Sequence, residues 1–229
     1  MSDFVADPLP DRTRITRLPE KGSRDRTALD ALLDATHIGH FGLSDASGRP
    51  VVLPTAVVRD GDRVLAHGST GSPWIRALAA GAPTCLAVTA FDGLVVARSA
   101  FESSFHYRSA VLFGSCTRLE RDATLRALDL ITEALLPGRV AEIRRPAERE
   151  LAATLVLALP IEEWSLKVSD GWPDDPPEDV VGDAWAGVVP IMVSYAQAVA
   201  APDLRAGIGV PESVRRLGSA GRRRRRRSR

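Results

Sequence analysis

The sequence predicts a mainly β fold with flanking helices, in which an antiparallel sheet meanders and closes into a barrel. Six short β-rich runs follow one another between residues 37 and 119, with turn signals between several of them. Helical patterns interrupt this meander and follow it. The chain of 229 residues is 45% apolar and 26% charged, the composition of an ordinary globular protein. These observations favour an α+β protein built on one antiparallel sheet.

A polar leader and a short helix precede the sheet. Residues 1–23 combine acids, arginines and prolines, and predict an extended or loosely docked segment. From Thr27 to Asp34, apolar residues recur at helical spacing, and Asp25 stands where it can cap the helix. The apolar positions of this predicted helix are Ala28, Leu29, Leu32 and Leu33.

Turn signals at Asp45–Gly48, Asp60–Asp62 and Asp92–Gly93 separate strands of the meander. A crossover helix interrupts it, with Ser72 as N-cap, Pro73 at the first helical position and Gly81 as its stop. The predicted strands are His37–Leu43, Val51–Arg59, Arg63–His67, Thr84–Phe91, Leu94–Ser99 and Ser109–Leu119.

Helices and one further strand follow the meander. Arg121–Leu136 carries an apolar stripe, and Ala147–Ala153 predicts a second helix. Thr154–Pro160 predicts a strand that continues less clearly to Lys167. Asp170–Asp183 is acidic and contains three prolines, as a surface loop would. Ala184–Val199 resumes a β-like pattern, with a helix as the alternative, so we expect one domain over residues 24–200 and a C-terminal extension over residues 201–229.

Charge is distributed unevenly along the chain. Arg222–Arg227 and Arg229 form a block of seven arginines without an acid, which leaves 23 basic and 29 acidic side chains in residues 1–221. Such a block predicts a solvated tail that contacts polyanions without sequence preference. A dedicated nucleic-acid arm is the alternative, and the absence of aromatic residues among the arginines disfavours it.

The sequence indicates a cytoplasmic protein and excludes several kinds of site. No apolar stretch reaches the ~20 residues of a membrane helix, and the first residues lack the apolar region of a signal peptide. Cys85 and Cys116 lie in apolar runs, which is typical of buried free thiols in a reducing compartment. His37 and His40 would point to opposite faces of a strand, so we expect no metal site there. Nucleophile-elbow, dinucleotide-binding and P-loop motifs are absent.

Two segments carry groups that could bind a ligand. From His67 to Arg76, a strand enters a turn rich in glycine and hydroxyl groups and a helix begins, which suits a phosphate monoester. An ordinary capped helix has the same pattern. From Arg98 to Ser109, polar and aromatic residues alternate in a connection between strands, which is equally typical of a solvated loop with aromatic anchors.

Read in order, short motifs from about Arg24 to about Val199 resemble the pyridoxamine 5′-phosphate oxidase-related family of FMN-binding split barrels, in the branch related to nitroimidazole-resistance flavoproteins. The motifs that carry the resemblance are Arg24–Arg26, His40–Gly42, Leu53–Thr55, Asp60–Asp62, His67–Ser69, Arg76–Leu78, Asp92–Phe101, Tyr107–Ser109 and Trp185–Pro190.

The resemblance implies an antiparallel split barrel, a homodimer with FMN between the subunits, and oxidoreductase activity on a small molecule. It makes His67 the candidate catalytic residue beside the flavin. It assigns cofactor binding to residues on strands, in the phosphate turn and near the C-terminus: Pro54, Thr55, Ser69, Ser72, Arg76, Tyr107, Arg108, Ser109, Lys167 and Trp185.

One position departs from the family pattern. Relatives usually carry a basic residue after the serine of the turn, where this chain has Pro73, so Arg76 or Arg108 would have to compensate. The departure favours the alternative of a barrel that has lost its flavin and serves as a binding or interaction module. The C-terminal region also lacks the arginine and histidine set for pyridoxal phosphate, so we expect no turnover of pyridoxamine phosphate.

Overall fold

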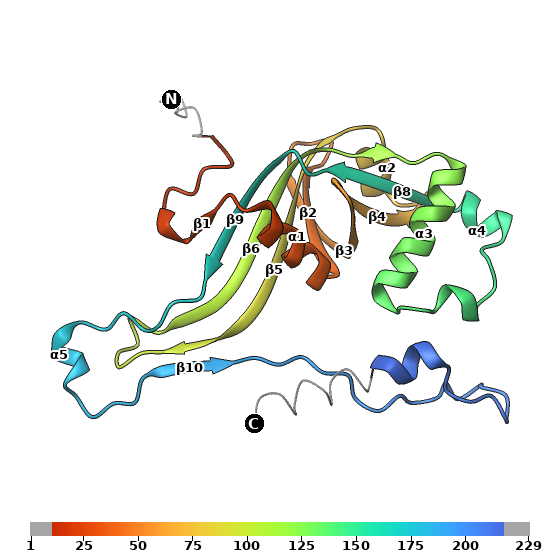
Figure 1. The fold of residues 1–229 in the computed structure, drawn as a ribbon. Helices are drawn as coiled ribbons and strands as arrows, with labels where there is room; N and C mark the ends of the chain where they lie inside the picture. The colour runs from red at the N-terminus through yellow and green to blue at the C-terminus, as the bar shows by residue number, and fades with distance from the viewer. Residues whose placement is uncertain (1–10, 218–229) are drawn as a thin grey trace, which may run out of the picture.

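The computed structural model describes residues 11–217 (Figure 1). Within these residues, one ten-stranded sheet has the order β1-β9-β6-β5-β2-β3-β4-β8-β7, and β10 pairs with β5. Every pairing in this part of the chain is antiparallel, which confirms the predicted fold class. The predicted tail from Arg222 to Arg229 lies outside the described residues.

The labelled helices are α1 Arg26–Ala35, α2 Pro73–Ala79, α3 Arg121–Leu135, α4 Glu148–Ala152 and α5 Pro177–Val180, with 3₁₀ turns η1 Pro19–Lys21 and η2 Val140–Glu142, and residues 212–217 are also helical. The strands are β1 Gly22–Ser23, β2 Ile38–Ser44, β3 Pro50–Asp60, β4 Arg63–Ser69, β5 Pro83–Val96, β6 Ser104–Ser115, β7 Thr117–Arg118, β8 Thr154–Pro160, β9 Glu163–Ser169 and β10 Gly187–Pro190.

The sheet curls around a main core. The first half of β3 pairs with β2 and its second half with β4, so β3 carries the sheet around a bend. Beyond β4, β8 comes back into contact with β6. Leucines of α1 at the predicted helical spacing pack inside this curl against Phe41 and Leu86, and Asp25 caps the helix by accepting a hydrogen bond from Thr27 N.

A smaller second core lies on the other side of the sheet. Val58, Leu65 and Val156 come from β3, β4 and β8, and they pack against Ala127 and Ile131 of α3. These strand residues alternate with residues of the main core, because successive side chains of a strand point to opposite faces. Thus α3 covers one half of the outside of the sheet.

The turn predicted at Asp92–Gly93 is wrong. β5 runs unbroken from Pro83 to Val96, and Asp92 is an extra residue where its register with β6 shifts between Phe91 and Gly93. A Cβ on Gly93 would lie 2.8 Å from the backbone oxygen of Val189 in β10. Gly93 therefore allows β10 to approach β5 closely. A turn signal, which depends only on neighbouring residues, does not reveal this contact.

Two other boundaries differ from the prediction. β6 begins at Ser104 instead of Ser109, so half of the predicted polar connection is strand. In Ala184–Val199, only Gly187–Pro190 pairs as a strand, and the residues after it are neither strand nor helix. β5 has β6 along one edge. Its other edge pairs with β10 at Gly93–Val96 and with β2 at Cys85–Ala87, so β10 can pair only with the outer end of β5.

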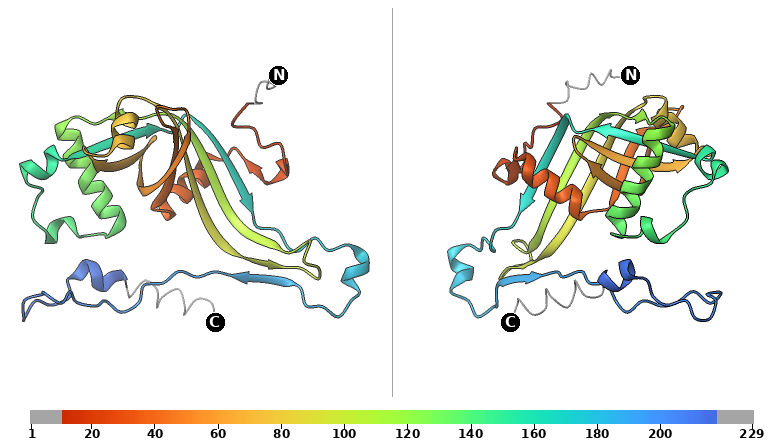
Figure 2. Two further views of the ribbon diagram at one scale, coloured as in Figure 1. Left: turned by 180° about the vertical axis from the view of Figure 1, so that it is seen from behind. Right: turned by 45° about the vertical axis from the view of Figure 1, so that its right-hand side comes forward.

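The β5–β6 hairpin projects from the body as a long arm, and the chain returns beneath it (Figures 1 and 2). β10 pairs with the outer end of β5, and residues 191–210, here named the strap, then run toward α3 and η2, extended at first and with turns after residue 200. No helix among residues 11–217 is long and apolar enough to cross a membrane.

Candidate functional site

One part of the sheet's outer surface carries no core of its own, and we name it the open face. It is formed by residues of β2, β3, β5, β6 and β9 that alternate with main-core residues. Direct cross-strand neighbours make up a continuous row across it: Ser165, Val111, Ala87, His40 and Pro54. A parallel row contains Glu163, Phe113, Cys85, Gly42 and Val52.

Small side chains lie in the middle of the open face, and exposed apolar ones lie along it. Ala87 and Gly42 keep the surface flat, while the side chains of Ile38 and Val52 are 61% and 65% exposed. At the β9 edge, the guanidinium of Arg12 pairs with Glu163 and lies over the ring of Phe113. A flat surface of this composition suits an aromatic ring system or another protein surface.

His67 stands on β4 where the open face meets the second core. It alternates with the buried Ala66, so it points away from the main core, to the same side of the sheet as Pro54. Its Nδ1 atom is buried without a hydrogen-bond partner among the described residues. Burial lowers the pKa of His67 below its ordinary value, so the ring is neutral at pH 7.

Groups of the predicted phosphate turn form hydrogen bonds with one another. Ser69 Oγ accepts a hydrogen bond from Gly71 N, and the Arg76 guanidinium donates to the carbonyl of Thr70 over 2.9 Å. Ser72 occupies the N-cap position of α2, but its hydroxyl makes no capping hydrogen bond. The structure thus brings these hydroxyls and Arg76 together directly after His67 at the end of β4.

The strand alternation of β6 divides the predicted set Tyr107, Arg108 and Ser109. Ser109 pairs with Lys167 of β9 and faces the open side, as Tyr107 does. Arg108 alternates with them and points to the side of the sheet that α1 covers. The structure therefore does not bring Arg108 together with its two neighbours.

Arg108 lies instead in a separate cavity of about 380 Å³. The cavity is bounded by Ala35 and Thr36 at the C-terminal end of α1, by Phe91, and by the first residues of the strap. Asp92 holds the guanidinium through two hydrogen bonds of 2.8 and 2.9 Å and raises the pKa of Arg108. This ion pair occupies the edge of the guanidinium formed by Nε and one Nη atom, so Arg108 is less available to a phosphate than predicted.

The other predicted residues are dispersed. Thr55 is next to Pro54 on β3, pairs with Gly39 and points to the opposite side from Pro54. Lys167 Nζ donates to the backbone oxygen of Arg17, 3.1 Å away. Trp185 is 65% exposed near the far end of β10, away from the turn after β4.

Sequence reasoning missed two features of this region. It interpreted Asp92 as a turn residue, whereas Asp92 is the partner of Arg108. It also left out His40, which is exposed in the middle row of the open face. A strand beginning at Ser104 would have given the alternation that separates Arg108 from Ser109. Among the described residues, no three histidine, cysteine or acidic side chains cluster as a metal site would require.

Comparison with known proteins gives a consistent result. The model of the pyridoxamine 5′-phosphate oxidase family matches residues 25–168. The FAD and heme binding protein from Mycobacterium smegmatis is 51% identical over 86% of this chain and 97% of its own, with a TM-score of 0.83. The flavocytochrome Anf3 from Azotobacter vinelandii is 34% identical over 91% and 97%, with a TM-score of 0.84.

A more distant structure shares the fold alone. It comes from Bacteroides thetaiotaomicron, and its name refers to 5-nitroimidazole antibiotic resistance. This protein is 19% identical over 64% of this chain and 86% of its own, with a TM-score of 0.55. No curated protein matches the chain.

Proposed function

The chain belongs to the pyridoxamine 5′-phosphate oxidase family, and on that premise we propose that it is a flavin-binding redox protein that works as a homodimer. The observation that carries the proposal is the position of His67. Its buried Nδ1 atom has no hydrogen-bond partner within residues 11–217, and the residue lies between the open face and a turn of hydroxyl groups. A flavin has a flat ring, a polar ring edge and a phosphate, which correspond to the open face, to His67 and to the hydroxyl-rich turn.

The residues of this region fit a flavin. The small side chain of Ala87 leaves room for a flat ring on the open face, and at Gly42 the thiol of Cys85 takes the place of a side chain. Ser69 and Ser72 offer hydroxyl donors to a phosphate, and Arg76 lies one turn further on. A bound flavin supplies electron or hydride transfer, and the protein's part is to bind, orient and shield it. Lys167, next to Ser109 on the open side, provides a cation toward negative charge on a reduced ring.

The proposal includes two alternative flavin cofactors, FMN and FAD. The family resemblance implies FMN, whereas the name of the 51% identical structure gives FAD. The same name includes heme, and a neutral histidine such as His67 would be able to hold heme iron. We therefore propose His67 as the residue that contacts a redox group, and chromatography of the released cofactor distinguishes FMN from FAD.

Reconstitution tests the proposal directly. Purified chain titrated with FMN, FAD or hemin should show the absorbance change of a bound chromophore. His67→Ala should weaken binding at least tenfold, whereas His106→Ala should not, because His106 Nε2 is hydrogen-bonded to the Gly171 carbonyl at the arm. A wild-type chain that takes up none of the three at high micromolar concentration would reject the proposal in favour of the flavin-free binding module.

Pro73 provides a second test. Pro73→Arg restores the basic residue that relatives carry in the turn, at the first position of α2 where other residues are tolerated. Flavin binding should become tighter and more sensitive to salt, since the new contact is with a phosphate. Unchanged binding would show that the phosphate does not lie in this turn.

A further inference from the structure

The strap is fixed at both ends by its own chain. At one end, Ile191 N donates to the carbonyl of Asp92 over 2.9 Å. At the other end, Ser213 donates from its N and Oγ atoms to the carboxylate of Glu142, at 3.1 and 2.5 Å, and Ser213 is only 2% exposed. Every residue of 191–210 between these two attachments is exposed. The chain thus presents the strap in a defined place without covering it.

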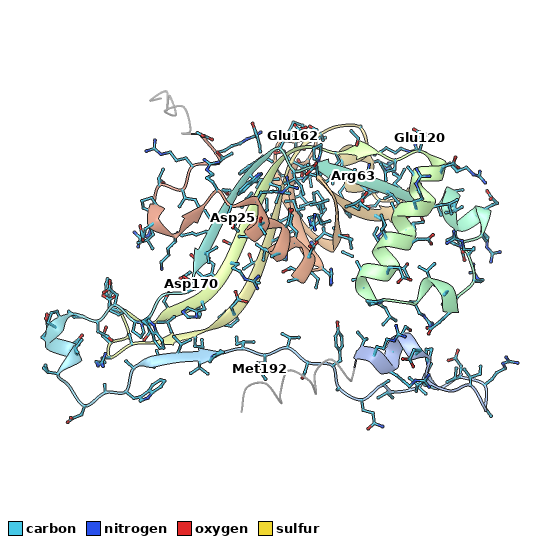
Figure 3. The ribbon with its side chains drawn as sticks, in the orientation of Figure 1. Asp25, Arg63, Glu120, Glu162, Asp170 and Met192 are labelled. Carbon is cyan, nitrogen blue, oxygen red and sulfur yellow. The ribbon has the colours of Figure 1, made fainter. Side chains whose placement is uncertain are left out.

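The exposed side chains in the first part of the strap, residues 191–202, are uncharged and largely apolar, and the charged Asp203 and Arg205 follow them. No charged residue occurs between Asp183 and Asp203. Within that stretch, Val193 and Val199 are 89% and 94% exposed, and Tyr195 is 60% exposed. Figure 3 shows the strap, marked by Met192, beneath the body. A contiguous apolar surface of this kind on a soluble chain indicates an interaction surface.

The strap and the open face of the same chain cannot cover each other. Residues Ile191–Ser194 line the Arg108 cavity with Ala35 and Thr36, so the strap begins on the α1 side of the sheet. The open face lies on the opposite side. A second copy, however, can bring its open face against the strap.

The two surfaces match in chemistry. The row of the open face from Ser165 to Pro54 contains no acidic residue, lysine or arginine, and the charged Glu163 and Lys167 lie on β9 at one end of this face. Its exposed Ile38 and Val52 are apolar like the strap. If the strap of one copy covers the open face of the other, two-fold symmetry forms the same contact twice and closes the assembly as a dimer.

We propose that the strap is a clasp for a second copy of this chain and lies across the open face of that copy. Each copy would then close one side of the other's candidate site beside His67. The inference rests on the proposed homodimer but not on flavin binding, and its tests use flavin-free protein. Its failure is therefore distinguishable from failure of the proposed function.

Charge substitutions test the clasp. Val193→Glu and Val199→Glu place a carboxylate on the strap, and Val52→Glu places one on the open face. Val181→Glu is the matched control, since Val181 is 85% exposed but lies outside the strap. Light scattering across a dilution series should give twice the chain mass for wild type and the control, and at least tenfold weaker association for the other three. Far-UV circular dichroism spectra should coincide, because all four sites are exposed in one chain and the substitutions leave its fold intact.

Cross-linking identifies the surface that the strap touches. Tyr195 is replaced by p-benzoylphenylalanine in isotopically heavy protein, which is mixed with light wild-type protein and irradiated. Heavy-to-light links should map to β2, β3 or β5. Links confined to one chain, links to α1, or a wild type that is monomeric throughout the dilution series would overturn the proposal. So would strap variants that associate as tightly as the Val181→Glu control.

Discussion

The guanidinium of Arg108 and the carboxylate of Asp92 form a two-point ion pair at the place where the register of β5 shifts against β6. The carbonyl of Asp92 also accepts the first hydrogen bond of the strap, from Ile191 N. One residue that sequence reasoning placed in a turn therefore joins three segments: β5, β6 and the strap. The following predictions test this joint and other particular features.

Asp92→Asn should lower the free energy of unfolding by about 1 kcal/mol, since the pair is bidentate but the two side chains are 32% and 38% exposed and therefore screened. Urea unfolding at low and high salt measures the effect, which should shrink in salt. Arg121→Gln breaks a more exposed pair with Glu148 and should change stability by less than about 0.5 kcal/mol. Equal losses in both variants would contradict this ranking.

Gly93→Ala should loosen β10 from β5, because the added Cβ would lie 2.8 Å from the Val189 oxygen and 3.2 Å from Pro190 Cα, both backbone atoms. We expect a loss of about 1–3 kcal/mol in the free energy of unfolding. Faster hydrogen exchange in β10 should accompany it. Gly171→Ala is the control, because nothing lies within 4 Å of its Cβ position. Unchanged exchange in β10 would contradict the prediction.

Acid should destabilise the fold through His67. Burial lowers the folded-state pKa of His67, so at mildly acidic pH the unfolded chain binds a proton that the folded chain does not. The free energy of unfolding should therefore decrease as pH falls below about 6.5, the ordinary histidine pKa. His67→Gln should make that decrease shallower between pH 7 and pH 5. If the free energy of unfolding depends on pH equally in wild type and variant, His67 is not the source of the acid destabilisation.

The two thiols should differ in reactivity. Cys116 is 3% exposed, and burial raises its pKa to about 12, so it has almost no thiolate at pH 8. Cys85 is partly exposed on the open face. Mass spectrometry after brief alkylation of the native protein should find the label on Cys85 alone, with Cys116 labelled after denaturation. Labelling of native Cys116 as fast as Cys85 would contradict the burial argument.

Removal of residues 218–229 should abolish retention of DNA or RNA and leave the melting temperature unchanged. Arginines that contact phosphates without reading bases should give the full chain a retention that is uniform across sequences and falls steeply with salt. Filter binding with several sequences at several salt concentrations measures this. Sequence-selective retention that survives the deletion would instead indicate a nucleic-acid-binding surface in the body.

Local patterns determined much of the fold. The leucine spacing of α1 and the turn signals around β3 and β4 located these elements to within a few residues. Such features depend on neighbours a few positions apart, which the sequence contains directly. The order of short motifs was also enough to identify the family, which the match over residues 25–168 bears out.

Tertiary structure decided which side chains meet. The direction of Arg108 depends on the alternation within β6, and the role of Gly93 depends on a strand almost a hundred positions later in the chain. The exposure of the strap depends on which surfaces remain uncovered after the helices have packed. The periodicity of a sequence shows which residues share a face of a strand. It does not show what packs against that face, because strand pairing between distant segments determines the register and the neighbours.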